Sequence, residues 1–203
     1  DGKVMINLWP TPVPEKGYEP NLLIFSLLRH GIDFDAIGVE LYPVGGIPRD
    51  HNGYPDLGWV SRTLRSFGVF EKPVILSEVS VPNRPSEETQ AEWLRDLYIT
   101  AFGKSFMKGI TWYFLTDDPF IPGGGLFNDD YTPRKAYLTL KELLNSWTSA
   151  GIGTTDDEGV FKFRGFAGQY DLVVSASGYE AKTVEIHIAE RRENSFEIVL
   201  NRL

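Results

Sequence analysis

A single carboxylate stands at the end of a short apolar segment. The segment 72–82 contains Val74, Ile75 and Leu76 between two prolines, and it presents Glu78 just after them. An apolar run of this length, bounded by turn residues, predicts a buried strand. In parallel α/β sheets and barrels the carboxyl ends of the strands face the ligand, so an acid at this position is placed for catalysis. The alternative is an acid that caps the next turn or pairs with an arginine, and this stretch alone favours neither.

The chain before Glu78 alternates between apolar strands and helices. Residues 3–9 form a compact apolar run that three prolines stop, and residues 33–42 form a second run, so both predict buried strands. Residues 19–29 and 57–67 carry apolar residues at helical spacing, and a glycine lies shortly after each segment. The expected order before Glu78 is therefore strand, helix, strand, helix.

The same alternation continues after Glu78. Ser86 is a good N-cap, and the helix that it predicts carries apolar residues at spacings of three and four as far as Phe102. Residues 109–115 predict a fourth strand, and a fourth helix is expected to end near Trp147. Four consecutive strand-then-helix units predict an α/β fold with parallel strands joined by right-handed crossovers.

The hydrophobic period changes from 3.6 to 2 after Trp147. Residues 148–153 are a linker of mainly small residues. Four alternating segments follow, at residues 159–163, 169–176, 181–188 and 195–200. They predict a small antiparallel β domain. The expected domains are therefore residues 1–147 and residues 148–203.

Composition narrows the possible partners. The chain has 203 residues, of which 42% are hydrophobic, so it can bury a core in one large domain or two smaller ones. Its net charge of −8 argues against nucleic acid and anionic membranes as partners, because both require a basic surface. No apolar run approaches the length that spans a bilayer. The absence of cysteine excludes disulfides, thiolate metal sites and cysteine nucleophiles.

No metal or cofactor site is expected. The three histidines are scattered without metal-ligand spacing. The glycine run 123–125 lacks the lysine and hydroxyl residue of a phosphate-binding loop, so it predicts a flexible rim loop. The acidic segment 156–159 has a weak similarity to a calcium loop, but a hairpin turn explains it more simply.

Several short motifs, in order, resemble the second half of a glycoside hydrolase family 10 endo-β-1,4-xylanase. They are Pro73-Val-Ile-Leu-Ser-Glu-Val-Ser-Val, Gln90-Ala-Glu-Trp-Leu-Arg-Asp-Leu, Gly109-Ile-Thr-Trp-Tyr and Gly125-Leu-Phe-Asn-Asp-Asp-Tyr-Thr-Pro-Arg-Lys-Ala-Tyr. The resemblance implies strands five to eight of a TIM (β/α)8 barrel. It also implies xylan hydrolysis with retention, in which Glu78 corresponds to the nucleophile on the seventh strand.

The resemblance leaves one catalytic group unaccounted for. A retaining glycosidase needs a protonated carboxyl roughly 5 Å from its nucleophile, and the family takes this acid from strand four, which has no counterpart in the sequence. Half a barrel would also leave two open sheet edges. Another chain, a second copy of this chain or a longer parent enzyme could supply the missing half-barrel, and we favour the longer parent.

Two residues on the expected sixth strand depart from the family pattern. Glu40 and Tyr42 stand where the resemblance would place Gln and His. Tyr42 is expected to hydrogen-bond Glu78 through its hydroxyl. Glu40 shares a face with Tyr42, so it could add a second carboxylate near Glu78 whose pKa would be raised, as a general acid requires. Pairing with a cation or packing at the barrel rim is the alternative for Glu40.

Aromatic and polar residues near the expected strand ends are candidates for sugar binding. They are Asn7, Trp9, Trp112, Tyr113 and Phe120. Each of the four aromatic residues can equally serve as core packing. The departures at these positions bear on xylan specificity more than on a glycoside hydrolase origin.

The C-terminal segment resembles carboxypeptidase-regulatory-like β-sandwich modules. The similarity extends from Asp157-Glu-Gly-Val-Phe-Lys-Phe to Gly168-Gln-Tyr-Asp-Leu-Val-Val-Ser-Ala-Ser-Gly-Tyr. Such modules are often attached to secreted enzymes, which implies an extracellular location, whereas the polysaccharide partner is implied by the xylanase resemblance. Two functions remain open: a nucleophile-bearing part of a retaining glycanase, or a non-catalytic polysaccharide-binding or scaffold protein derived from one.

Overall fold

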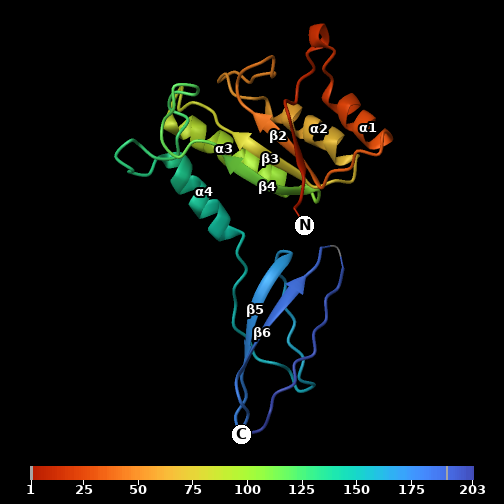
Figure 1. Cartoon of the computed structure of the whole chain (residues 1–203). Coiled ribbons are helices and arrows are strands. Elements are labelled where there is room, and N and C mark those ends of the chain that lie inside the picture. The colour runs from red at the N-terminus through yellow and green to blue at the C-terminus, as the bar shows by residue number, and fades with distance from the viewer. Residues whose placement is uncertain (1, 191) are drawn as a thin grey trace. The chain divides into compact units, whose positions relative to one another are not determined.

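The chain folds into two units. The computed structural model describes residues 2–190 and 192–203. The first unit extends to Leu143 and the second runs from Leu144 to Leu203. Figure 1 shows the helices and the parallel sheet of the first unit and the two strands of the second.

A four-stranded parallel sheet forms the centre of the first unit. Its strands lie in the order β1-β2-β3-β4, so neighbours in the sequence are neighbours in the sheet. They are β1 (Met5–Leu8), β2 (Ala36–Leu41), β3 (Val74–Val79) and β4 (Met107–Trp112). The helices are α1 (Pro20–Arg29), α2 (Leu57–Gly68), α3 (Glu87–Phe102) and α4 (Lys135–Ser146), and a short 3-10 helix covers Pro14–Lys16. The predicted order of four strand-then-helix units is confirmed, although β4 begins and ends earlier than expected.

The core lies between the helices and one face of the sheet. Ile37, Val39 and Leu41 of β2 alternate along the strand and are at most 1% exposed, and they belong to one apolar cluster with Leu64 and Phe67 of α2. Burying such side chains provides the main driving force for this packing. The opposite face of β2 carries Gly38 and Glu40 by alternation, and this face holds the candidate site.

Side-chain caps fix where the helices begin. The carboxylates of Glu19 and Asp56 accept hydrogen bonds from the backbone of the first turns of α1 and α2. Ser86 does the same for α3, as its sequence predicts. Each cap follows a loop from the carboxyl end of a strand, so the caps also fix the length of the loops around the candidate site.

The glycine loop after β4 differs from its prediction. Residues 123–125 are buried, and their carbonyl oxygens accept hydrogen bonds from Gln90, Trp112, Ser80 and Arg134. The prediction of a flexible rim loop was wrong because it considered only backbone freedom. The polar groups that hold the loop come from residues that are distant in the sequence.

The second unit contains less regular structure than expected. Strands β5 (Gly168–Val174) and β6 (Lys182–Ile188) form an antiparallel pair. Residues 159–163 and 195–200 were predicted as strands, but neither forms one. Their aromatic residues stay largely exposed, with Phe161 at 49% and Phe196 at 44%, so these segments lack the buried face that stabilises a sandwich strand. The predicted turn at Asp156 is present.

Among the described residues, we find no helix that combines the length and apolar character needed to cross a membrane.

Candidate active site

A β-bulge places Glu78 at the candidate site. In the register between β2 and β3, Val39 pairs with Leu76 and Glu40 pairs with Glu78, so Ser77 is an extra residue on β3. The ladder between β3 and β4 shifts at the same place. A bulge of this kind redirects the side chains that follow it.

The bulge reverses the direction that simple alternation would give Glu78. Val74 and Leu76 are fully buried against the helices, and strict alternation would put residue 78 on their face. The extra residue instead brings Glu78 beside Glu40, and Val79 returns to the buried face. The half-buried carboxylate of Glu78 therefore lies on the face of the sheet away from the helices.

Tyr42 donates a hydrogen bond to this carboxylate. Its hydroxyl lies 2.8 Å from Glu78 Oε2, and its side chain is only 2% exposed. Burial raises the pKa of the Tyr42 hydroxyl well above its usual range, and the hydrogen bond to Glu78 raises it further. Tyr42 is thus a neutral donor at all ordinary pH values, and it holds one carboxylate oxygen in place. The structure agrees with the expected contact between these two residues.

A second carboxylate, Glu40, belongs to a small polar network. Asn7 Nδ2 donates to Glu40 Oε1 at 2.7 Å, and Ser77 Oγ donates to Asn7 Oδ1 at 2.5 Å. These three residues come from three strands, and Gly38 makes the network possible. A Cβ on Gly38 would lie 2.6 Å from Asn7 Oδ1, so a larger residue would displace Asn7.

Glu40 is electrostatically coupled to Glu78. The paired backbones of neighbouring strands lie about 4.8 Å apart, so the two side chains leave the sheet side by side. Burial raises the pKa of the Glu40 carboxyl, and the negative charge of Glu78 raises it further. A carboxyl group beside the candidate nucleophile is therefore biased toward its protonated form.

We expect Glu40→Gln to stabilise the chain by about 0.5 kcal/mol at pH 7, because it removes a like charge beside Glu78. The amide oxygen of glutamine can still accept the hydrogen bond of Asn7. The folded state raises the pKa of Glu40, so protonated Glu40 contributes to the stability of the wild type at low pH, and this contribution is lost as the pH rises through the folded pKa. The stability advantage of Glu40→Gln over the wild type should therefore be smaller at pH 4 than at pH 7. Urea denaturation at both pH values measures it, and a variant less stable than the wild type at pH 7 contradicts the prediction.

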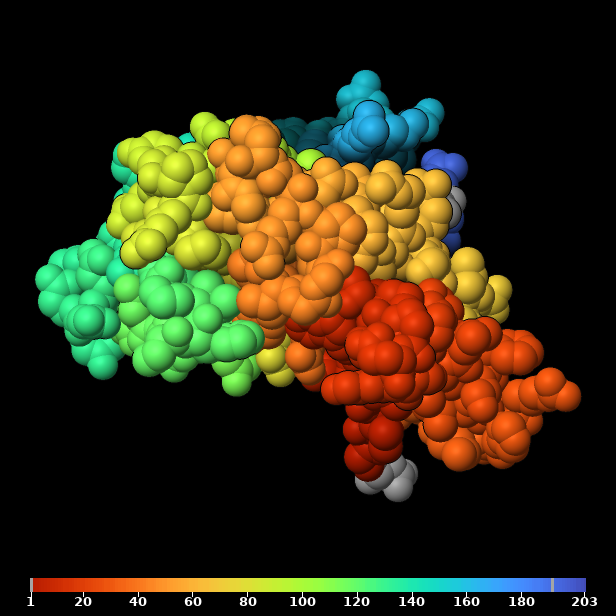
Figure 2. All heavy atoms as spheres, turned by 90° about the horizontal axis from the view of Figure 1, so that it is seen from above, coloured from red at the N-terminus to blue at the C-terminus, as the bar shows by residue number. Residues whose placement is uncertain are grey.

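Two predicted aromatic residues lie around the Tyr42–Glu78 pair. The Tyr42 ring makes edge contacts with Tyr113 and Phe120, at centroid distances of 5.9 and 5.1 Å. Tyr113 is 51% exposed and Phe120 is 54% exposed. Rings that are anchored at one edge and exposed at the other can stack on a sugar. Figure 2 shows this end of the unit, with the orange segment after β2 between the red segment after β1 and the green segment after β4.

The two predicted tryptophans are held in other ways. Trp112 pairs with the buried Val79, packs on the core and donates to the carbonyl oxygen of Gly124 at 2.7 Å. It therefore lies on the face opposite to Glu78. Trp9 is half-buried and packs so closely on Gly45 that a Cβ there would lie 2.5 Å from its ring. Both indoles contribute to packing and are partly buried, and their role in sugar binding stays a prediction.

Sequence reasoning missed Ser77 and Gly38. Neither residue type marks a site by itself, and the bulge that makes Ser77 important leaves no local sequence signature. Asn7 was predicted to bind sugar; in the structure its amide contacts Glu40 and Ser77, and sugar binding by Asn7 stays a prediction. Within residues 2–190 and 192–203, no cluster of three or more His, Asp or Glu side chains is arranged to hold a metal ion.

No protein-family model matches the chain, but two curated proteins are similar to it. Over 158 residues it is 28% identical to anti-sigma-I factor RsgI6 of Acetivibrio thermocellus, a match that covers 77% of this chain and 20% of that protein. Over 196 residues it is 26% identical to endo-1,4-beta-xylanase 1 of Arabidopsis thaliana, a match that covers 94% of this chain and 19% of that protein. The second match includes most of the second unit. The chain spans about a fifth of each of these relatives.

Solved structures similar to the chain include family 10 xylanases. The glycosylated endo-β-1,4-xylanase of glycoside hydrolase family 10 from Gloeophyllum trabeum superposes with a TM-score of 0.53 and 22% identity, over 70% of this chain and 46% of that one. Xylanase 10B of Clostridium thermocellum, in complex with xylohexaose, superposes with a TM-score of 0.55 and 18% identity, over 70% of this chain and 29% of that one. The chain therefore has an α/β fold whose four parallel strands match part of the TIM barrel of family 10 xylanases, as its sequence predicts.

Proposed function

We propose that the chain is the nucleophile-bearing part of a retaining glycoside hydrolase of the endo-β-1,4-xylanase type. The observation that carries the proposal is the position of Glu78, which a bulge turns onto the open face of the sheet and which Tyr42 holds by a hydrogen bond. The likeness to xylanase structures and the similarity to a plant xylanase support xylan as the substrate class.

In the proposed reaction, Glu78 attacks the anomeric carbon and forms a covalent glycosyl intermediate. Water then hydrolyses this intermediate, so the product keeps the configuration of the substrate. Tyr42 orients the attacking carboxylate, and Tyr113 and Phe120 provide surfaces for the neighbouring sugar rings. Burial and the charge of Glu78 shift the pKa of Glu40 in the direction that a proton donor requires, and its hydrogen bond from Asn7 also suits a supporting role.

We further propose that the general acid comes from a first half-barrel. Strands β1 and β4 each pair with one neighbour only among the described residues, so both edges of the sheet are open. On α1, which follows β1 in the chain, Leu22 is 66% exposed and Phe25 is 55% exposed. An open parallel sheet flanked by exposed apolar side chains is suited to packing against further strand-helix units.

The test is release of the aryl group from an activated aryl β-xylobioside. Such a leaving group needs little protonation, so the assay reports on the nucleophile even where the acid is absent. The chain is assayed alone and with a separately produced first half of the Gloeophyllum trabeum barrel, and the anomer of the first product is read by NMR. Retention supports the proposal. Inversion, or no turnover in either assay, contradicts it.

Tyr42→Phe is expected to lower the turnover of the aryl xylobioside by about tenfold and to leave KM nearly unchanged. The phenyl ring keeps the packing of the site, but Glu78 loses the donor that orients it, so the loss falls on the bond-forming step. Tyr18→Phe is the matched control, because it also removes a tyrosine hydroxyl, but one that donates to the backbone oxygen of Trp9 and not to Glu78. An equal loss in both variants would argue against a specific role for Tyr42.

A non-catalytic role in polysaccharide binding is the second candidate. One observation favours it: a relative that matches 77% of the chain is named an anti-sigma-I factor, which is not the name of an enzyme. In that case the chain should bind xylohexaose with the same affinity in the wild type and in Glu78→Gln, and neither protein should release the aryl group. Calorimetry and the aryl assay together separate the two candidates.

A further inference from the structure

Two hydrogen bonds connect the bulge residue of β3 to the carboxylate of Glu40. Ser77 Oγ donates to Asn7 Oδ1 at 2.5 Å, and Asn7 Nδ2 donates to Glu40 Oε1 at 2.7 Å. Ser77 holds the amide oxygen of Asn7, so the amide presents its N–H group to the carboxylate. Because Glu40 pairs with Glu78 in the register of the sheet, this relay from Ser77 through Asn7 ends beside the candidate nucleophile.

Gly38 provides the space that the relay needs. It pairs with Asn7 across β1 and β2, and a Cβ at this position would lie 2.6 Å from Asn7 Oδ1 and 3.1 Å from Met5 Sδ. Gly38 is not among the glycines with a positive φ, so its backbone conformation does not require glycine. Glycine weakens the interior of a strand, and here the room for Asn7 accounts for its presence.

The titratable groups around Glu40 do not supply a positive charge. Glu78 faces it from β3, and the hydroxyls of Tyr42 and Tyr18 lie within electrostatic range. Burial is the main cause that raises the pKa of both tyrosine hydroxyls, so both stay neutral. Among the described residues, Glu40 forms no ion pair. Its carboxylate therefore depends on Asn7 for stabilisation.

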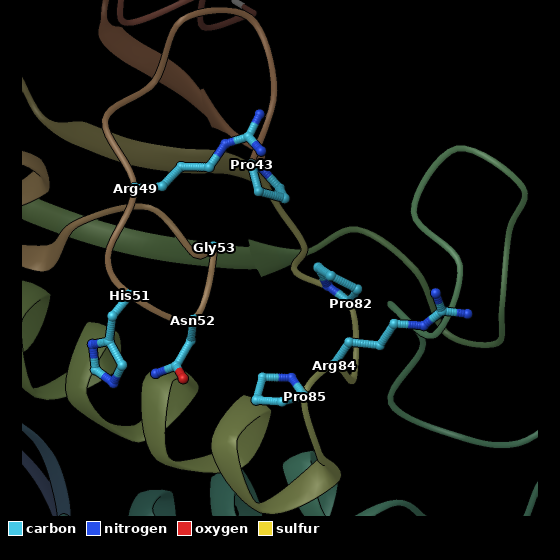
Figure 3. Close-up of a pocket in the computed structure, with 8 residues that line it drawn as sticks. All are labelled: Pro43, Arg49, His51, Asn52, Gly53, Pro82, Arg84 and Pro85. Carbon is cyan, nitrogen blue, oxygen red and sulfur yellow. The ribbon is translucent and has the colours of Figure 1, made fainter.

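The arginines of the neighbouring loops are also directed elsewhere. Arg49 follows β2 and Arg84 follows β3, and both line an open hollow of about 600 Å³ between these two loops (Figure 3). Neither Glu40 nor Glu78 lines this hollow. The pair of carboxylates thus keeps its negative charge without a cationic partner among the described residues.

The relay acts against the other influences on Glu40. Burial and the charge of Glu78 raise its pKa, whereas a hydrogen bond donated to a carboxylate favours the ionised form. We propose that Asn7 and Ser77 are positioning residues that keep Glu40 ionised, so that Glu40 supplies a fixed negative charge beside Glu78 and not a proton. Such a charge stabilises the positive charge that develops on a sugar in the transition state. The catalytic part of this inference rests on the proposed function, whereas the ionisation of Glu40 does not.

The first experiment measures the ionisation of Glu40 without a substrate. The side-chain carboxyl carbon of Glu40 is followed by ¹³C NMR during a pH titration of the full chain, and its signal is assigned by its absence in Glu40→Gln. The acid dissociation constant of Glu40 should fall about threefold in Asn7→Ala and about twofold in Ser77→Ala, because the ionised form loses its donor or the anchor of that donor.

Two further variants make this titration specific. Ser77→Thr keeps the hydroxyl and should recover the wild-type constant, and Ser66→Ala removes a serine hydroxyl on α2 that donates to the backbone oxygen of Thr63 and should have no effect. An unchanged or increased constant in Asn7→Ala and Ser77→Ala overturns the proposal. Equal changes in Ser77→Thr and Ser77→Ala also overturn it, because the hydroxyl would then not be the cause.

The second experiment distinguishes a fixed charge from a proton donor. Glu40→Gln is assayed on the activated aryl β-xylobioside and on xylohexaose, in the assembly in which the wild type turns over. A fixed charge predicts a loss in kcat of about tenfold on both substrates with KM nearly unchanged. A proton donor predicts a loss on xylohexaose alone, because the activated aryl group leaves with little protonation, and this result overturns the proposal.

The relay residue should show the same pattern at a smaller scale. Ser77→Ala is expected to lower kcat about twofold on both substrates, and Ser77→Thr should recover most of the loss. An unequal loss on the two substrates in Ser77→Ala speaks against the proposal. If the wild type turns over neither substrate, the proposed function fails, and the NMR titration alone decides whether Asn7 and Ser77 keep Glu40 ionised.

Discussion

Turnover of an aryl β-xylobioside is expected to fall by about 10⁴-fold or more when Glu78 is replaced by glutamine, because the amide cannot form the covalent intermediate. The substitution keeps the size of the side chain and an oxygen that can accept the hydrogen bond of Tyr42. The fold should therefore be preserved, and the loss should appear in the chemical step. The measurement uses the assembly in which the wild type turns over.

Glu92→Gln is the matched control for this variant, since Glu92 is exposed on α3. It should keep the wild-type rate. Sodium azide provides a second readout in Glu78→Ala, where the small anion can occupy the space of the missing carboxylate and attack the anomeric carbon directly. The product should then be the α-glycosyl azide, the anomer opposite to the product of the wild type. Formation of the β-azide would assign Glu78 to proton transfer instead.

The second large effect concerns stability. We expect Arg134→Met to lower the free energy of unfolding by about 3 kcal/mol, because it breaks an ion pair in which the arginine is only 7% exposed. Arg134 holds both oxygens of Asp117, at 2.6 and 2.9 Å, and also binds Asn128. It thereby ties the loop after β4 to the start of α4. Urea denaturation followed by tryptophan fluorescence measures the change.

Arg95→Met is the control for this prediction. Arg95 pairs with its neighbour Asp96, and both side chains are about half exposed, so its loss should cost less than about 1 kcal/mol. The pH dependence adds a second criterion. The hydrogen bonds from Arg134 lower the pKa of Asp117, so the stability that they provide is complete above the unfolded pKa of about 3.9 and is lost as the pH falls through the folded pKa. The difference between the wild type and Arg134→Met should therefore narrow below pH 4, and a constant difference would contradict the assignment.

Local patterns were sufficient to predict the architecture of the first unit. Short apolar runs mark the strands, and apolar residues at helical spacing mark the helices that pack on one face of the sheet. Both patterns arise from burial, which dominates the choice of secondary structure. Ser86 illustrates how a cap residue adds to this signal, because its hydroxyl accepts a hydrogen bond from Thr89 at the start of α3. The order of such elements limits the topology to parallel strands, which the register shows.

The details of the site depend on features that local patterns do not contain. Strict alternation along β3 would bury Glu78 beside Leu76, and only the register with both neighbouring strands reveals the extra residue at Ser77. Gly38 is informative only when Asn7 is seen to cross above it. The second unit was predicted less well, because alternation indicates which side chains share a face but not whether a partner strand covers them.

The buried glycine loop after β4 bears on the entropic part of the free energy of ligand binding. The carbonyl oxygen of Gly124 accepts two hydrogen bonds, from Ser80 and Trp112, and the carbonyl oxygen of Gly123 accepts one from Gln90. The conformational entropy of this loop is therefore lost when the chain folds, before any ligand arrives. Tyr113 and Phe120 precede this loop in the sequence. A saccharide that contacts them would not have to order the loop, so its binding free energy is not reduced by the cost of closing a mobile segment.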